Sequence, residues 1–260
     1  MYSVMRVRGE PERRRTWTIA ALAMVTLRAG MAASAWAAPL EPGTYRLEMS
    51  FASSAALPLL GRVHSATVST SLAEIRDHDG ALEQTHRVCD ARFEGAVPGT
   101  SVEMPPEFVR ALATPSYPVS LAEDGSAWLY RADLGVEAVG WHAAERAPLP
   151  RNLDDPAIFD WDGDGEPAAT LRVRVAGLPA GEVWVVQRAH SVLAGRVLSS
   201  GRVEGAIEIL LLEQAVVGAR PGFLRWSPDA TPDPEHSRFV LERVAAGTTC
   251  SDLVSGGSAR

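Results

Sequence analysis

Three aspartates at alternate positions form the densest group of metal-ligand side chains in the sequence. They belong to a D-x-D-G-D-G stretch at residues 160–165. Calcium prefers six to eight hard oxygen ligands, and alternate residues of a tight loop direct their carboxylates inward, while a glycine at the sixth position permits the sharp turn. The predicted calcium ligands are the carboxylates of Asp160, Asp162 and Asp164 and the main-chain carbonyl of Glu166.

This stretch resembles the first half of the calcium loops of EF-hand and dockerin-like secreted proteins, over residues 160–171 only. The twelfth position is Leu171 instead of a bidentate glutamate, and the ninth, Ala168, has no side-chain oxygen. The resemblance therefore implies a calcium loop of a secreted β-protein, with further ligands from water or nearby acids. Asp154 and Asp155 are the nearest such acids. The alternative is an acidic turn with solvated carboxylates, although three like charges so close together repel one another without a cation.

The other residues that could take part in catalysis or metal binding are scattered along the sequence. The six histidines form no H-x-H or H-E-x-x-H pair, and the chain has no G-x-S-x-G or glycine-rich phosphate motif. His78 and His86 flank an expected hairpin, and we expect both on the surface. We therefore predict no catalytic residue, although folding can assemble a catalytic triad from distant positions.

Two tryptophans lie beside proline- and glycine-rich segments, where an exposed ring could stack on a ligand or sugar. They are Trp141 and Trp226, which we predict to form the rim of a ligand site. The alternative for each is core packing.

The N-terminus has the features of a secretory signal at residues 1–37. Five arginines precede a short apolar stretch, and Ala35-Trp36-Ala37 matches an A-x-A cleavage site, so we predict a mature chain that begins at Ala38. Arg14 and Arg15 weakly resemble a twin-arginine signal, and the general secretory route is favoured. We expect a secreted or periplasmic protein with no transmembrane segment after cleavage.

Export implies an oxidising compartment, and Cys89 and Cys250 are the only cysteines. We predict that they form one structural disulfide.

The charge of the expected mature chain narrows the choice of partners. Residues 1–37 carry six of the 25 arginines and two of the 32 acids, which leaves 19 and 30 and a net charge of about −11. Nucleic acids and anionic membranes attract positive surfaces, so we exclude them as partners.

Most of the remaining chain shows the period-two pattern of half-buried strands, as in Tyr45–Phe51. Asp79-Gly80 separates two long strand-like runs and predicts a tight hairpin, as does Asp124-Gly125. The one expected helix is short, near residues 106–113. We expect one all-β domain over 38–254 and a flexible tail at 255–260. Its antiparallel meander closes into a lipocalin-like or half-open β-barrel, with a β-sandwich as the alternative.

These features favour a non-enzymatic exported β-barrel protein that binds a small apolar ligand or a cell-envelope partner, with a calcium-stabilised loop. Two alternatives stay open at this point. One is an extracellular hydrolase, and the other is a carbohydrate-binding or adhesive module.

Overall fold

The computed structural model describes residues 40–57, 61–95, 99–125, 127–142, 147–198, 201–225 and 230–257. Residues 37–260 form one compact unit, to which everything below refers. The expected signal segment, residues 1–37, lies outside the described residues.

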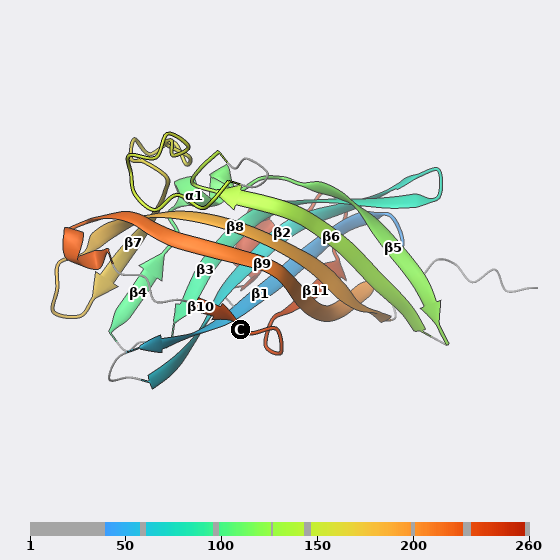
Figure 1. The fold of residues 1–260 in the computed structure, drawn as a ribbon. Helices are drawn as coiled ribbons and strands as arrows, with labels where there is room; N and C mark the ends of the chain where they lie inside the picture. The colour runs from blue at the N-terminus through green and yellow to red at the C-terminus, as the bar shows by residue number, and fades with distance from the viewer. Residues whose placement is uncertain are drawn as a thin grey trace, which may run out of the picture. The chain divides into compact units, whose positions relative to one another are not determined.

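The described residues of this unit contain eleven strands, two α-helices and one 3-10 helix, and Figure 1 shows how the strands are arranged. In chain order they are β1 (Gly43–Leu57), β2 (Gly61–His78), β3 (Ala81–Gly95), β4 (Thr100–Glu103), α1 (Pro106–Ala111), β5 (Ser116–Asp124), β6 (Ala127–Val139), β7 (Ala169–Val175), β8 (Gly181–Leu198), β9 (Arg202–Arg220), η1 (Gly222–Leu224), β10 (Ala230–Pro232), β11 (Arg238–Arg243) and α2 (Cys250–Gly257).

Eight of the strands close into a hydrogen-bonded ring. The order is β1-β2-β3-β5-β6-β8-β9-β11, and β11 returns to β1, so that every neighbour pair is antiparallel and follows chain order. Three short strands branch from this ring: β7 pairs with β8, β4 with β7, and β10 with β1. The all-β prediction is confirmed, and the ring is a meander closed on itself.

The turn chemistry of the sequence explains the first hairpin. Asp79 and Gly80 have φ values of 55° and 88°, the positive pair that a two-residue hairpin between twisted strands needs. β5 and β6 likewise pair from Val119–Ala132 to Asp124–Ala127, on either side of the second predicted turn.

Apolar side chains that point inward from several strands of the ring form its main hydrophobic core. Alternate residues of β1, Tyr45 and Leu47, are fully buried, as are their neighbours Ala73 and Ser71 on β2, while Leu47 also faces the buried Leu241 on β11. The fifteen buried members of this cluster are Leu40, Tyr45, Leu47, Met49, Ala73, Ile75, Tyr117, Val119, Tyr130, Ala132, Leu193, Val203, Ile207, Phe239 and Leu241.

The two edges of β9 differ. β9 pairs with β8 along its whole length, but with β11 only from Arg202 to Ala206. Its register with β8 shifts twice, which leaves Leu210 and Val217 as extra residues without a partner on β8. Leu210 is 57% exposed, so the apolar run in this strand is not covered on both faces at this residue.

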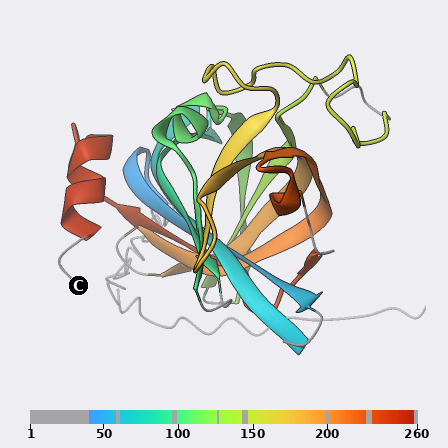
Figure 2. The same ribbon diagram turned by 90° about the vertical axis from the view of Figure 1, so that its left-hand side faces the viewer.

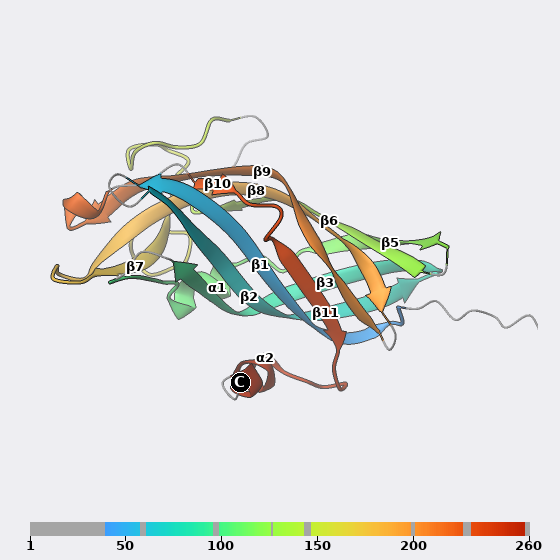
Figure 3. The same cartoon turned by 90° about the horizontal axis from the view of Figure 1, so that it is seen from below.

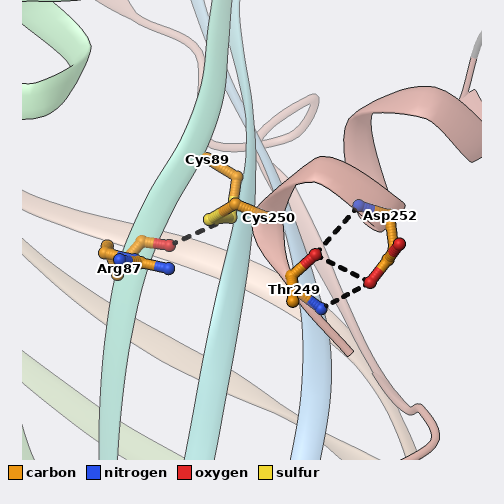
Figure 4. Close-up of a disulfide and its surroundings, with 5 residues drawn as sticks. All are labelled: Arg87, Cys89, Thr249, Cys250 and Asp252. Carbon is orange, nitrogen blue, oxygen red and sulfur yellow. Dashed lines mark hydrogen bonds between the residues drawn. A yellow bond between two sulfur atoms is a disulfide. The ribbon is translucent and has the colours of Figure 1, made fainter. Parts of the chain in front are cut away.

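The predicted disulfide is present. Cys89 and Cys250 are bonded, with their Cα atoms 5.1 Å apart (Figure 4). Cys89 is the extra residue of a bulge in β3, because Ser71 pairs with Val88 and Thr70 with Asp90. The bond holds α2 against β2 and β3, on the outside of the strands in Figures 2 and 3.

Helix α2 extends into the first part of the predicted tail. The helix continues through Gly257, past the predicted start of a flexible segment at residue 255. A capping box begins it: the main-chain N–H and the hydroxyl of Thr249 both donate to a carboxylate oxygen of Asp252, at 2.8 and 2.7 Å (Figure 4). The predicted short helix before β5 is also present, as α1. Neither helix, nor any other helix within the described residues, is long and apolar enough to span a membrane.

Candidate functional site

The acidic stretch lies in the long connection between β6 and β7. Ligand oxygens of Asp160, Asp162 and Asp164 lie within 4.8 Å of one another, so this group could hold a metal ion. Within the described ranges, it is the one group of three or more acids, histidines or cysteines whose ligand atoms already lie this close together.

Asp160 organises the loop through its carboxylate. One of its oxygens accepts the main-chain N–H groups of Gly163 and Asp164, at 2.8 and 3.1 Å, and the other accepts that of Gly165 at 3.0 Å. Gly163 and Gly165 have φ values of 74° and 90°, which only glycine adopts without strain. The sequence therefore folds here into a tight turn around a carboxylate, whose remaining oxygen surface faces the other two aspartates.

Asp162 is the least satisfied member of the group. Its Oδ2 accepts the N–H of Thr170 at 2.9 Å, whereas its Oδ1 is buried without a hydrogen-bond partner. Burial raises the pKa of this carboxyl above its usual value, and the charges of Asp164 and Asp160 raise it further, against the lowering effect of Thr170. The group thus holds a buried oxygen that lacks a hydrogen-bond donor or a cation.

The loop is fixed at both ends. Asp160 and Ala168 form a parallel bridge, and the N–H of Trp161 donates to the Ala168 carbonyl at 3.1 Å. The Trp161 ring packs edge-on against Phe108 of α1, with centroids 5.4 Å apart. The acidic group therefore lies where α1, β7 and the long connection meet.

The other predicted ligands are engaged elsewhere. The Glu166 carboxylate pairs with Arg220 at 2.7 Å, which leaves only its predicted main-chain donor role open. Asp154 and Asp155 do not belong to the group. Asp155 accepts the N–H of Ala157 at 2.9 Å, so it caps a local turn. The structure therefore does not bring these two acids into the group.

The predicted tryptophan rim is also corrected. Trp141 is only 3% exposed, and its indole N–H donates to the Gln187 carbonyl at 3.1 Å. It packs in a buried apolar cluster with Leu149 of the same connection and with Trp184 and Val186 of β8. The connection therefore uses Trp141 to cover apolar surface of the sheet. Trp226 lies outside the described residues.

Sequence reasoning missed a buried polar network inside the ring. Gln84 donates from its amide nitrogen to the Tyr117 hydroxyl and accepts from the Tyr130 hydroxyl, both at 2.8 Å. His86 Nδ1 lies 2.8 Å from the same Tyr117 oxygen. His86 is 6% exposed, so the expectation of a surface histidine is wrong. The available signal was its spacing: Gln84 and His86 stand two residues apart on the inward face of β3.

Burial controls the titration of this network. It lowers the pKa of His86 to about 4 and raises those of Tyr117 and Tyr130 above their usual values. All three groups are therefore neutral at pH 7, as a hydrogen-bonded cluster in an apolar interior requires.

A shallow groove of about 190 Å³ lies across β3, β2, β1 and β11. Arg238, Ser50, Val68 and Arg92 follow one another in register across these strands, so an arginine stands at each end of the row. Arg92 pairs with Glu94 at 3.0 Å, whereas no described carboxylate lies within 4 Å of the Arg238 guanidinium. The groove offers apolar surface beside the unneutralised Arg238, and the Glu48 side chain, which pairs with Arg46 at 3.5 Å, also lines it.

No known family, curated protein or solved structure matches this chain.

Proposed function

We propose that this chain is an exported, secreted or periplasmic, binding protein whose Asp160–Glu166 loop holds calcium. The observation that carries the calcium assignment is the buried, unpartnered Oδ1 of Asp162 beside two further carboxylates within 4.8 Å. An oxygen in that position costs free energy unless a cation or donor meets it. All donors in the group are hard oxygens, which suits calcium better than zinc or copper.

Calcium in this position would act as a structural clamp. Asp162 is hydrogen-bonded to the second residue of β7, and Trp161 contacts α1. An ion between the three carboxylates would remove their mutual repulsion and so stabilise the connection that covers Trp141 and Trp184. Water supplies the coordination positions that side chains leave open.

A thermal melt of the oxidised protein tests the calcium proposal. We expect calcium at one hundred times its dissociation constant to stabilise the fold by about 2.7 kcal/mol. That corresponds to a melting temperature about 5–10 °C above that in EDTA for a unit of this size. Extracellular sites have dissociation constants of about 10⁻⁴–10⁻³ M, so about 10–100 mM calcium reaches this regime.

The matched variants are Asp162→Asn and Asp154→Asn. Asp162→Asn removes the charge at the buried oxygen and should abolish the calcium-dependent rise. Asp154 lies in the same connection outside the acidic group, and its variant should keep the rise. An equal response to calcium in both variants, or none in the wild type, would contradict the proposal.

The proposed ligand is a small amphipathic molecule that occupies the groove between Arg92 and Arg238. The interior of the ring beside Tyr45 and Leu47 is filled with side chains, which favours an external site. The unneutralised Arg238 favours a ligand with an anionic head and an apolar body.

Octanoate, measured by titration calorimetry, is a suitable probe. We expect Arg238→Gln to weaken its binding by about tenfold or more, the effect of losing a hydrogen bond to a charged group. Arg174→Gln is the control, because Arg174 is also exposed and, in the part of the chain described, has no ion pair. Octanoate that binds the two variants equally, or does not bind the wild type, would rule out the groove as the ligand site.

A further inference from the structure

Two histidines and an aspartate from distant parts of the chain meet beside β1. His64 stands on β2, and Asp233 and His236 belong to the turn between β10 and β11. The His236 Nδ1 lies 2.8 Å from Asp233 Oδ2, and the His64 Nδ1 lies 3.7 Å from the same oxygen. One carboxylate oxygen thus faces two imidazoles.

The carboxylate is held firmly by the backbone around it. The Asp233 N–H donates to the Ala52 carbonyl at 2.9 Å, and the Ser237 hydroxyl donates to the Asp233 carbonyl at 2.8 Å. The Ser237 hydroxyl also accepts the Ala52 N–H at 3.0 Å. These bonds anchor the turn to β1 and fix the position of Asp233.

The two imidazoles, in contrast, lie at the surface. The His64 and His236 side chains are 64% and 67% exposed, while that of Asp233 is 17% exposed. The group combines one fixed carboxylate oxygen with two exposed imidazole nitrogens.

We propose that His64, Asp233 and His236 form a second metal site, for a divalent transition-metal ion such as zinc. Two imidazole nitrogens and a carboxylate oxygen are a donor set that zinc, copper and nickel accept, and that calcium does not favour. Both Nδ1 atoms face the same oxygen, so a metal ion could bind all three atoms when each imidazole carries its proton on Nε2. The two imidazole nitrogens lie 2.8 and 3.7 Å from the carboxylate oxygen, so both exposed rings would have to turn to bring the three ligands to the distance of about 2.0–2.2 Å that zinc requires, with water in the fourth tetrahedral position.

This site would pin the β10–β11 turn to β2 across β1. His64 pairs with Ser54 of β1, whose other neighbour is Thr231 of β10. The nearby cation Arg62 donates to the Ser54 hydroxyl at 3.1 Å, so its guanidinium is held on β1. The proposal is independent of the acidic loop, which lies in a different connection and offers only oxygen donors.

Calorimetric titration with Zn²⁺ tests the proposal on the full, oxidised protein without a histidine tag. We expect micromolar binding of one zinc ion, weakened at least about tenfold by His64→Gln or His236→Gln, a loss that even an outer-shell change commonly causes. The Hε1 proton resonances of these two histidines should shift on addition of zinc.

The matched control is His78→Gln. His78 is also an exposed histidine beside a carboxylate, 3.1 Å from Glu83, but has no second imidazole at that carboxylate within the described residues. His78→Gln and Asp162→Asn should both leave zinc binding unchanged. Zinc affinity that is the same in the wild type and in both site variants, or a shift of the His78 resonance alone, would overturn the proposal. The four variants change exposed or half-exposed side chains, so their circular dichroism spectra should match that of the wild type.

Discussion

The ring interior and the acidic loop each gather polar side chains, and they satisfy them in opposite ways. Inside the ring, Gln84 joins two tyrosines and the network is neutral. In the loop, three carboxylates of the same sign converge, and one buried oxygen has no partner. In the first cluster, the protein itself supplies hydrogen-bond partners for the buried polar side chains. The second is incomplete, and an incomplete polar cluster is the better indication of a ligand.

The difference follows from the elements that carry the clusters. Strands β3, β5 and β6 hold the ring network by a continuous register, so donors and acceptors match one to one. The loop is shaped by bonds from its own backbone to Asp160 and Asp164, which use up the available N–H groups. Three predictions test this contrast.

The largest expected effect is at the centre of the ring network. Gln84→Leu preserves volume but leaves the Tyr130 hydroxyl without its acceptor and the Tyr117 hydroxyl without a donor. Each buried hydroxyl that loses a partner costs about 1–3 kcal/mol, so we expect the free energy of unfolding to fall by about 4 kcal/mol in urea titrations. Gln214→Leu, at an exposed position on β9, should change it by less than about 0.5 kcal/mol. Equal effects of the two substitutions would mean that the network adds no stability.

Acid should destabilise the ring through His86. The pKa of this buried histidine is about 4, against an ordinary value of 6.5, so the unfolded chain binds more protons between these pH values. The contribution of His86 is complete above pH 6.5 and decreases as the pH falls to 4, by about 3 kcal/mol in all. Urea unfolding of wild type and His86→Gln at pH 7.5 and 4.0 isolates it. The variant should lose less stability on acidification, and identical losses would contradict the assignment.

The smallest effect concerns the acidic loop without calcium. In EDTA, Asp162→Asn removes a disfavoured charge, and we expect it to raise the free energy of unfolding by about 0.5 kcal/mol, a magnitude usual for substitutions at such positions. In saturating calcium the same substitution should lower stability relative to wild type. This reversal of sign is measured in paired thermal melts. A variant that is less stable than wild type in both conditions would show that Asp162 serves the loop through its hydrogen bonds alone.

The sequence allowed the architecture to be predicted because local rules apply there. Period-two alternation, as in β1, follows from burial of one strand face, and Asp79-Gly80 specifies a hairpin through its backbone angles. Strands of three or four residues such as β4 and β10 carry too few residues for a period to show.

The site was only partly predictable, for a related reason. The acidic triplet is local in sequence and was found, whereas its supposed partners Asp154 and Asp155 were assigned by proximity along the chain alone. Trp141 and His86 were both placed on the surface, and both are buried. The burial of Trp141 depends on which distant segment covers it, whereas the spacing of His86 from Gln84 places both on one face of β3 but does not say that this face is buried.

The two extra residues of β9 bear on how this protein behaves at high concentration. From Ile207 onwards, β9 has no described strand on its second edge, and such an edge is a template for intermolecular sheet growth. Leu210 and Val217 each shift the hydrogen-bonding register of β9 by one residue. A regular strand from another molecule could therefore pair with β9 in one register only over the short stretch between these two residues. The irregularities thus act as a built-in guard against polymerisation, in a strand whose apolar sequence would otherwise favour fibres.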